Sequence, residues 1–551
     1  MKLSVASTLL FATSLASAEL LRSGIISSAA ETVQQVADSA CNDQHDQASC
    51  FGTIDESSGS PCSWCECAAV PSECLSPEQA KLVPPSVFNC KTPGREFQFL
   101  QDDGSTTYRS KLHSHPVHDT KDDEFCDASS KSMSGYFEVK GSDYDKNGEN
   151  KHYFYWMFEK RGATREDLEK GDIPFVVWLT GGPGCSSTMA LLTENGPCSV
   201  NEDGATTSVN PYSWTEAAHV LWLDQPAGVG FSYGSESDTS EQMIGEDAYY
   251  FLQSFFQTYE EYSSSPLYIV GESYGGHYAP AIAHRVWVGN KKPGDSTIKL
   301  NLAGLGVGNG LTKPEEQYKW YPEMVYNNSH GIKVVSEETY ESMKAVVPKC
   351  ASLIHQCNQG DGAINTFACQ SAFYVCNMGL TSPYQMTGLN PYDIRKKCEV
   401  PPLCYDFSHI TKWVNSEATK QALHVDEQHS HNWSSCNMEI NMRFHTDWMK
   451  DFSGYVADLL NDGIPALIYA GDVDFICNYL GNQAWTHDLE WSGGDDFRAA
   501  TPHDWNNGKG LARTAKGLTF LQVYDAGHMV PTDQPEVSLD MLKLFLSGGE
   551  F

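Results

Sequence analysis

The stretch Leu267-Tyr268-Ile269-Val270-Gly271-Glu272-Ser273-Tyr274-Gly275 carries an apolar run directly into a serine flanked by glycines. Continuous apolar runs of this kind are typical of strands buried on both faces of a parallel sheet. A helical pattern follows at residues 278–286. Glycine is needed two residues to either side of Ser273, because a Cβ there would clash with neighbouring backbone in a sharp strand-to-helix turn. The stretch predicts a turn that exposes the Ser273 hydroxyl above the sheet and aims the helix N-terminus at it.

Other apolar runs have the length of short strands and lie at residues 175–179, 220–223, 302–307, 466–469 and 520–524. Longer helical patterns, such as residues 245–259, lie between them. Strands that alternate with helices form a mostly parallel sheet with helices on both faces. From about Cys126 onward, the sequence therefore predicts an α/β fold.

The alternation breaks between about residues 311 and 425. Helix-like stretches there accompany a group of cysteines: Cys350, Cys357, Cys369, Cys376, Cys398 and Cys404. An insertion of this kind lies above the carboxyl ends of the strands, where ligands bind in such sheets. We expect residues 311–425 to form a helical cap insertion over the site, held by local disulfides.

A serine hydroxyl needs a base that takes its proton, and His528 is the best placed of the 18 histidines because it follows a late apolar run. After a strand–serine–helix turn, the order along the chain is serine, acid, histidine. The acid should therefore follow another strand between Ser273 and His528. Asp472 and Asp474 both do so, and spacing alone does not choose between them.

The glycine-rich turn Thr180-Gly181-Gly182-Pro183-Gly184 follows the apolar run at 175–179. Its N–H groups can point toward Ser273 and form an oxyanion hole together with the N–H of Tyr274. A phosphate-binding loop is the rival interpretation. It is disfavoured because no Gly-Lys-Ser/Thr follows and because Pro183 has no N–H.

The N-terminus has the pattern of a secretory signal peptide: Lys2, an apolar run at residues 3–16, and Ala16-Ser17-Ala18 before Glu19. We expect residues 1–18 to be this signal and residues 19–40 to be a linker. No later run reaches the length of about 18 apolar residues that a membrane span needs. The 18 cysteines then favour disulfides formed in an oxidising compartment.

Two N-glycosylation sequons begin at Asn327 and Asn432 and agree with this route. We therefore expect the secretory pathway, with an extracellular or a vacuolar (lysosomal) destination. The net charge of −34 repels phosphate backbones and disfavours anionic membranes, so we expect no nucleic-acid partner. The length of the apolar runs predicts no membrane span.

A separate cysteine-rich segment covers residues 41–90 and holds Cys41, Cys50, Cys62, Cys65, Cys67, Cys74 and Cys90. It has no clear helical or strand period, so we expect a small module held by disulfides, followed by a linker or pro-segment at 91–125. Because seven is odd, one cysteine should pair outside the cluster, with Cys126 as the candidate. Zinc is the rival interpretation of Cys62-Ser63-Trp64-Cys65, which secretion disfavours. Over this stretch alone the segment resembles the plexin–semaphorin–integrin interaction module, so an unknown partner is expected.

Several segments together resemble the serine carboxypeptidases, in particular the carboxypeptidase Y-like and plant type III members: residues 178–187, 223–233, 271–278, 308–310, 474–478 and 527–531. The resemblance covers about residues 126–548. It implies an α/β-hydrolase fold that releases C-terminal amino acids from peptides and proteins with a free C-terminus, at acidic pH and through an acyl-enzyme. It implies no metal and no cofactor.

The resemblance also assigns roles to single residues. The triad would be Ser273 as nucleophile, His528 as base and Asp474 as the orienting acid. The oxyanion hole would use the N–H groups of Gly182 and Tyr274. The substrate's terminal carboxylate would be held by Thr180, Gly181, Glu194 and Glu272. Many members have Asn where this chain has Thr180. Threonine keeps a hydroxyl donor but lacks the amide of that Asn. The type III plant enzymes also have Thr at this position.

Two glutamates that face a carboxylate must hold at least one proton, so the resemblance implies raised pKa values and a KM for peptides that rises above pH about 6. It further implies a disulfide between Cys398 and Cys404 and a free Cys477 near the site, which makes the enzyme sensitive to mercurials. Alternatives are an acyltransferase with the same triad, disfavoured by Glu272 where those enzymes often have Asp, and a general esterase or lipase. A third is a binding protein with an inactive hydrolase domain.

Overall fold

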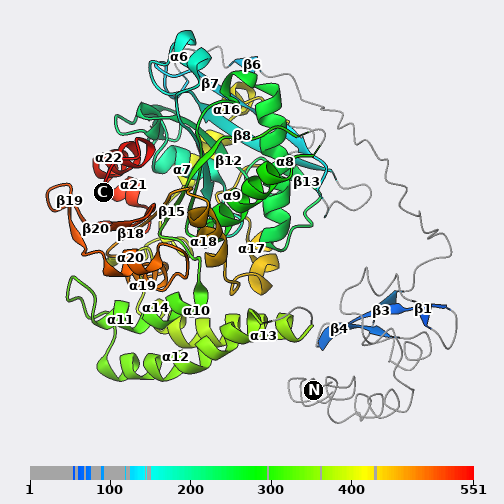
Figure 1. Cartoon of the computed structure of the whole chain (residues 1–551), viewed down its shortest axis with the longest axis vertical. Coiled ribbons are helices and arrows are strands. Elements are labelled where there is room, and N and C mark those ends of the chain that lie inside the picture. The colour runs from blue at the N-terminus through cyan, green and yellow to red at the C-terminus, as the bar shows by residue number, and fades with distance from the viewer. Residues whose placement is uncertain are drawn as a thin grey trace. The chain divides into compact units, whose positions relative to one another are not determined.

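The computed structural model describes residues 54–55, 60–67, 70–75, 89–91, 118–119, 125–142, 144, 150–294, 297–359, 363–426 and 431–551. The predicted signal peptide at 1–18 and linker at 19–40 lie outside the described residues. The chain divides into two units, residues 1–106 with 356–371, and residues 107–355 with 372–551. Figure 1 shows the elements of both.

The second unit is built on a 12-stranded sheet in the order β19-β20-β21-β18-β15-β14-β9-β12-β8-β7-β6, with β13 paired to β8. Its central strands run parallel to one another: β12 (His219–Leu223), β9 (Phe175–Thr180), β14 (Leu267–Glu272), β15 (Leu302–Gly308), β18 (Ala466–Gly471) and β21 (Leu518–Val523). Each overlaps one of the apolar runs predicted as strands. The predicted α/β fold with a parallel central sheet is confirmed.

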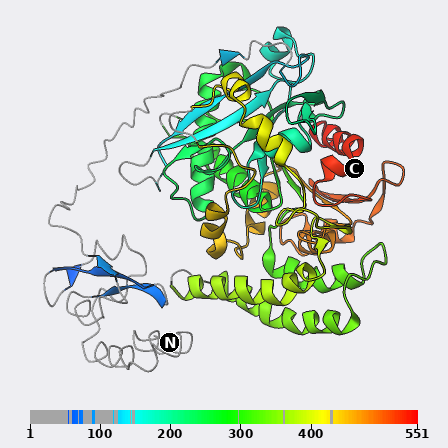
Figure 2. The same cartoon turned by 180° about the vertical axis from the view of Figure 1, so that it is seen from behind.

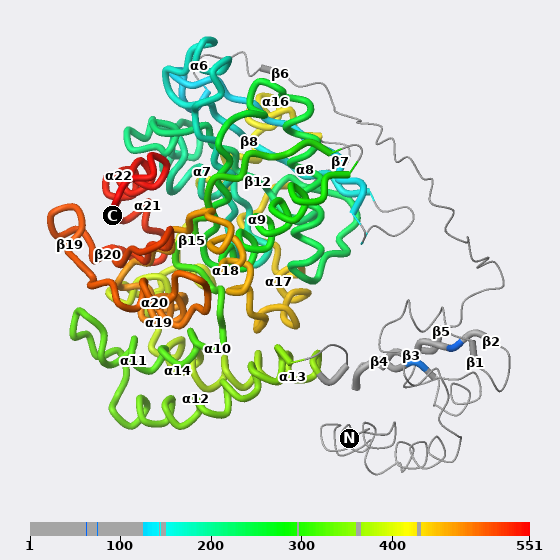
Figure 3. Tube along the Cα trace, in the orientation of Figure 1, coloured from blue at the N-terminus to red at the C-terminus, as the bar shows by residue number. Residues whose placement is uncertain are grey.

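Antiparallel strands extend the sheet at both edges (Figure 3). One edge has β8 (Lys151–Phe158), β7 (Ser132–Val139), β6 (His118–Asp119) and β13 (Tyr233–Gly234); the other has β20 (Gly510–Ala515) and β19 (His503–Trp505). The sequence analysis did not identify these strands. Strand β6 lies inside the segment 91–125 that was expected to be a linker, so two residues of that segment belong to the sheet.

Helices cover both faces of the central sheet (Figures 1 and 2). They include α7 (Ser187–Thr193), α8 (Glu241–Thr258), α9 (Gly275–Lys291), α18 (Ser453–Asn461) and α22 (Pro535–Leu546). Trp178 of β9 packs in one core with residues of α7 and α22. Phe175, an odd number of residues away on the same strand, points to the opposite face and contacts Phe255 and Phe256 of α8. Helix α9 begins directly after the turn at Ser273, three residues before the predicted start.

The predicted cap insertion is helical and carries disulfides, as expected. Its main elements are α10 (Pro314–Gln317), α11 (Tyr321–Tyr326), α12 (Glu337–Cys357), α13 (Ala363–Cys376), α14 (Ser382–Gln385), β16 (Leu389–Asn390), β17 (Asp393–Lys397), α15 (Ser408–Val414) and α16 (Glu417–Ala422). The disulfide Cys350–Cys376 joins α12 to α13. The predicted disulfide Cys398–Cys404 is present directly after β17.

The first unit contains the described part of the cysteine-rich segment. Its strands are β1 (Ile54–Asp55), β2 (Ser60–Pro61), β3 (Ser63–Cys67), β4 (Val70–Leu75) and β5 (Asn89–Lys91), with β3 between β4 and β5. Cys62 and Cys74 are buried and disulfide-bonded. Residues 356–371 of this unit contain the disulfide Cys357–Cys369.

The expected pairing of Cys126 with the cysteine-rich segment is wrong. Cys126 forms a disulfide with Cys198, with the two Cα atoms 5.3 Å apart. Cys126 lies before β7, and Cys198 begins β10 (Cys198–Val200), so the bond joins two segments within the second unit. Cys185 pairs with Cys436. Among the described helices, none has both the length and the apolar character to cross a bilayer.

Candidate active site

The turn after β14 holds Ser273 in the left-handed region, with φ of 63°. This conformation is strained for a residue with a Cβ and is typical of a nucleophile held at a strand-to-helix turn. The flanking glycines are required by space: a Cβ on Gly271 would lie 2.4 Å from the Gly275 oxygen, and one on Gly275 would lie 2.7 Å from the Leu179 oxygen. The prediction that a Cβ on either glycine would clash with neighbouring backbone is therefore confirmed.

Asp474 lies after β18 and faces His528, which lies in the loop after β21. His528 Nδ1 is 2.9 Å from Asp474 Oδ2, and both side chains are buried. The alternative acid, Asp472, accepts instead from His330 Nε2 at 2.9 Å and from the N–H of Asp525. The structure thus brings Asp474 rather than Asp472 to the imidazole.

Cys477 contacts both Ser273 and Asp474 through different groups. The Cys477 thiol interacts with the Ser273 side chain, and the Cys477 N–H donates to Asp474 Oδ2 at 3.1 Å. Cys477 is a buried free cysteine, as expected from the resemblance. Burial raises the pKa of its thiol, and the nearby Asp474 and Glu272 charges raise it further. Among the described contacts, Ser273 and His528 make no direct hydrogen bond, as is common for catalytic pairs that tighten only with substrate bound.

The glycine-rich turn after β9 packs directly on the amide that follows the serine. A Cβ on Gly181 would lie only 2.3 Å from the Tyr274 nitrogen. Gly182 has a φ of 107°, and a Cβ there would lie 2.8 Å from the Cys185 nitrogen. The disulfide Cys185–Cys436 fixes the turn from its other side. These contacts bring the backbone of the turn close to the N–H of Tyr274, where an oxyanion hole would need it.

Glu272 and Thr180 occupy the same register position at the ends of the adjacent parallel strands β14 and β9. The Thr180 oxygen accepts a hydrogen bond from Trp178 Nε1 at 3.0 Å, which leaves the hydroxyl proton available to donate. Glu194, the residue after α7, completes the group. All three side chains are buried at 5% exposure or less, so this corner of the site is shielded from bulk solvent.

The two glutamates share an unusual environment. Among the described residues, neither oxygen of Glu194 has a hydrogen-bond donor, and its interaction partner is the carboxyl group of Glu272. Burial raises the pKa of Glu194 to about 7. Burial, together with the charge of Glu194, raises the pKa of Glu272 well above its ordinary value. Because both carboxyl groups are buried and two neighbouring carboxylate charges would repel each other, the pair favours holding a proton.

Two residues at the site were not assigned a role by the sequence analysis. Asn309 Nδ2 donates to Asp474 Oδ2 at 2.9 Å. The backbone oxygen of Tyr392, from the cap insertion, accepts from the N–H of His528 at 2.8 Å. Asn309 belongs to the segment 308–310 that resembles the family, so the sequence contained a signal for it. The contact of Tyr392 uses a backbone oxygen and leaves no signal in the sequence. The sequon residues Asn327 and Asn432 are exposed.

The parallel sheet, the serine turn and the buried His–Asp pair define a hydrolase of the α/β-hydrolase class. The sequence profile of the serine carboxypeptidases matches residues 123–548. Carboxypeptidase Y of Komagataella phaffii is 42% identical over 424 residues, covering 76% of each chain. Carboxypeptidase Y of Candida albicans is 42% identical over 426 residues, covering 76% of this chain and 73% of its own. The chain belongs to the serine carboxypeptidase family and is a serine-type carboxypeptidase.

A solved structure agrees with this membership. Kex1Δp, a prohormone-processing carboxypeptidase from Saccharomyces cerevisiae, superposes with a TM-score of 0.65 at 26% identity. The alignment covers 76% of this chain and 92% of that one. The fold of the second unit is thus that of a known carboxypeptidase.

Proposed function

We propose that the chain removes C-terminal residues one at a time from peptides and proteins through an acyl-enzyme on Ser273. The observation that carries the proposal is the pair of buried carboxyl groups of Glu194 and Glu272, whose pKa values burial raises, with Glu272 directly before the nucleophile in the sequence. A site that offers protonated carboxyl groups suits a ligand carboxylate, because each shared proton becomes a hydrogen bond. A free peptide C-terminus is such a ligand.

In the proposed reaction, Ser273 Oγ attacks the last peptide carbonyl while His528 Nε2 takes the hydroxyl proton. Asp474 holds the other nitrogen, Nδ1, and stabilises the imidazolium that forms. The N–H groups of Gly182 and Tyr274 stabilise the oxyanion. His528 then gives its proton to the departing amino acid, and a water molecule hydrolyses the acyl-enzyme by the same route in reverse.

The substrate's terminal carboxylate would be bound by Glu272, Glu194, the Thr180 hydroxyl and the Gly181 N–H. Thr180 is suited to this role because Trp178 already fills the acceptor position of its oxygen. The loss of an amide at position 180 therefore leaves one donor, which is enough for one carboxylate oxygen. Acidic pH favours binding because it keeps a proton on the glutamate pair.

The remaining assignments are supported by sequence pattern. Residues 1–18 and the five described disulfides of the chain agree with passage through the secretory pathway, to the cell exterior or to a vacuole or lysosome. We assign residues 41–90 as a disulfide-held module for an unidentified partner and residues 91–125 as a linker or pro-segment. Asn327 and Asn432 are exposed and open to glycosylation.

The decisive experiment compares wild type with Ser273→Ala on a blocked dipeptide and on the same dipeptide amidated at its C-terminus. We expect wild type to hydrolyse the free acid with the lower KM, and Ser273→Ala to lose turnover while its circular dichroism stays unchanged. A fluorophosphonate probe should label wild type only. Peptidase activity in the variant, or acyl transfer from a glucose ester faster than peptide hydrolysis, would refute the proposal.

A further inference from the structure

The cap insertion sends one short segment, residues 391–396, between the two loops that carry the acid and the base. The Ile394 N–H donates to the Val473 oxygen at 2.9 Å. The N–H groups of Phe475 and Ile476 donate to the Pro391 oxygen, both at 3.1 Å. These bonds lie on either side of Asp474, so the cap segment fixes the backbone of the acid loop.

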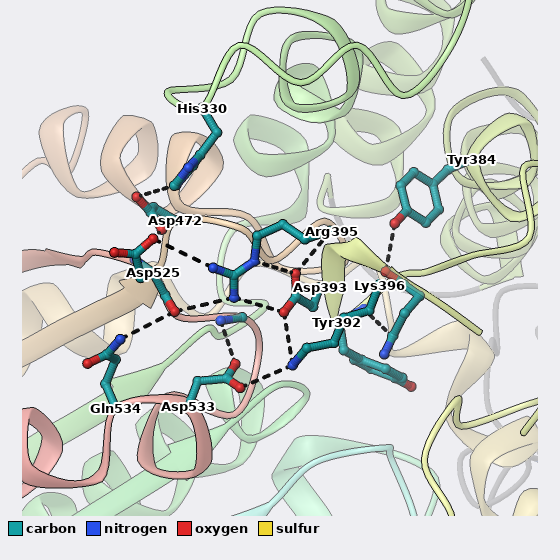
Figure 4. Close-up of polar contacts among 12 residues, drawn as sticks. His330, Tyr384, Tyr392, Asp393, Arg395, Lys396, Asp472, Asp525, Asp533 and Gln534 are labelled. Atoms are coloured by element: carbon teal, nitrogen blue, oxygen red, sulfur yellow. Dashed lines mark hydrogen bonds and ion pairs between the residues drawn. The ribbon is translucent and has the colours of Figure 1, made fainter. Parts of the chain in front are cut away.

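The same segment binds the base loop. The His528 N–H donates to the Tyr392 oxygen at 2.8 Å. The approach is close, because a Cβ on Gly527 would lie 2.3 Å from that oxygen and 3.3 Å from Cβ of Asp393. The residue before the base is therefore a glycine for a local reason: only glycine leaves room for the cap segment. Figure 4 shows Tyr392 and Asp393 beside Arg395 and Lys396.

Asp393 is the charged centre of the segment. Its side chain is fully buried and accepts from Arg395 through Nε and Nη2, both at 2.9 Å, and from Lys396 Nζ at 3.0 Å. Burial alone would raise the pKa of Asp393, but the hydrogen bonds from Arg395 and Lys396 outweigh it and leave this pKa below its ordinary value. Asp393 is thus a stable anion that holds two cations.

Arg395 and Lys396 also contact residues before and after His528 in the base loop (Figure 4). Arg395 Nη2 donates to the Asp525 oxygen at 3.3 Å, three residues before the base. Lys396 Nζ lies 3.3 Å from Asp533 Oδ1, and Asp533 Oδ2 accepts from the Gly527 N–H at 2.8 Å. One buried carboxylate in the cap therefore organises contacts before and after His528.

We propose that Asp393 is a positioning residue for the base: through Arg395 and Lys396 it clamps the loop of His528 against the loop of Asp474. This inference rests on the proposed catalytic role of His528. The base loop has no regular secondary structure between β21 and α21 (Val530–Asp533), so its position depends on such contacts. A catalytic imidazole must be held to within about 0.5 Å, and misplacement by about 1 Å can cost a hundredfold in rate.

The inference predicts which kinetic constant changes. The described contacts of Asp393, Arg395 and Lys396 do not include Glu194, Glu272 or Thr180. Loosening the clamp should therefore lower kcat and leave KM nearly unchanged. It should slow the labelling of Ser273 by a fluorophosphonate in the same proportion, since acylation needs the same base.

The test uses Asp393→Asn in the full chain, which keeps the size of the side chain and turns a carboxylate oxygen into an amide that repels the cations. We expect kcat for a blocked dipeptide to fall about tenfold to a hundredfold, with KM within about twofold. A milder variant at a half-exposed site, Lys396→Gln, should lower kcat by a few fold, and Lys396→Arg should restore it. Glu246→Gln is the matched control, because Glu246 pairs with Arg285 between α8 and α9.

Unchanged kcat in both Asp393→Asn and Lys396→Gln would overturn the inference. So would an equal loss in Glu246→Gln, because any partly buried ion pair would then have the same effect. If Asp393→Asn does not fold, the Lys396 pair of variants decides. Failure of the proposed function would look different, since wild type itself would then lack activity that depends on Ser273.

Discussion

Asn309 Nδ2 lies 2.9 Å from Asp474 Oδ2, the same carboxylate oxygen that receives Nδ1 of His528. Asn309 is fully buried and its own Oδ1 accepts from the Gly471 N–H at 3.0 Å, so its amide has one orientation. The acid of the site is therefore held by a side chain at the end of β15 as well as by the N–H groups of its own loop.

Replacing Asn309 should lower both the stability of the protein and its catalytic rate. Asn309→Ala leaves a buried carboxylate oxygen short of one donor, which costs about 1–3 kcal/mol. We expect kcat to fall about tenfold, and Asn309→Asp to be worse because it sets a second anion beside Asp474. The control is Asn290→Ala, which removes an asparagine that bridges two backbone groups of Leu300. Equal kcat in the two alanine variants would contradict this role for Asn309.

The pair Glu194–Glu272 should set the upper pH limit of peptide binding. Burial raises the pKa of Glu194 to about 7, and the site binds a carboxylate best when both glutamates are protonated and each can donate a hydrogen bond. Protons are bound below that pKa and lost above it, so KM for a free-acid peptide should rise above pH about 7, by up to tenfold per pH unit. This pH is higher than the pH of about 6 above which the resemblance alone predicts KM to rise.

An amidated peptide is the control for the glutamate pair, because it lacks the carboxylate and should show a nearly flat KM. Glu272→Gln keeps a hydrogen-bond donor without an ionisable proton, so it should weaken the pH dependence for the free acid as well. Parallel KM–pH curves for acid and amide would show that the limit lies elsewhere.

Much of the site could be predicted from local patterns. The serine turn, the glycine-rich turn and the base loop each follow an apolar strand, and parallel strands bring their carboxyl ends to one edge. Asp472 and Asp474 could not be separated, because two residues of one loop differ only in what each faces. The structure separates the two aspartates, because His330 of the cap insertion binds Asp472.

The clamp around His528 could not be predicted for a different reason. The contact between Tyr392 and His528 joins residues far apart in sequence and uses a backbone oxygen that any residue would supply. The edge strands are another case. Residues 153–158, Tyr-Phe-Tyr-Trp-Met-Phe, are as apolar as the predicted strands, so that signal was present and was not used.

Thermal stability should fall as pH rises, because other buried acids also hold protons. Asp447 accepts from the Tyr274 hydroxyl at 3.3 Å, and burial raises its pKa to about 7. When folding raises the pKa of an acid, its full contribution to the free energy of unfolding is present below its unfolded pKa of about 4. This contribution is lost as pH rises through the folded pKa. Each pKa unit corresponds to about 1.4 kcal/mol.

We therefore expect the Tm to be several degrees higher at pH 5 than at pH 8. Asp447→Asn can still accept from Tyr274 and no longer titrates, so its Tm should fall less over the same range. Differential scanning calorimetry of both proteins measures this. An Asp447→Asn protein with the full wild-type drop in Tm would assign the effect to other groups.

Cys477 should be slow to alkylate and yet responsible for inhibition by mercurials. The thiolate is the reactive form, and burial raises the pKa of this thiol, so iodoacetamide should react slowly at pH 8. The other ten cysteines from Cys126 onward are in disulfides. We expect Cys477→Ser to keep most of its activity and to resist a mercurial that inhibits wild type. Inhibition of that variant would implicate a different thiol.

The adjacency of Glu272 and Ser273 at the end of β14 would set the length of the fragment that is released. In the proposed reaction, Glu272 binds the terminal carboxylate and Ser273 attacks the adjacent peptide bond, so the span between them would admit a single amino acid. A dipeptide cannot be released, because its scissile bond would lie one residue beyond the hydroxyl. Each cut exposes a fresh carboxylate at the correct length, so shortening proceeds in unit steps until the next side chain fits poorly.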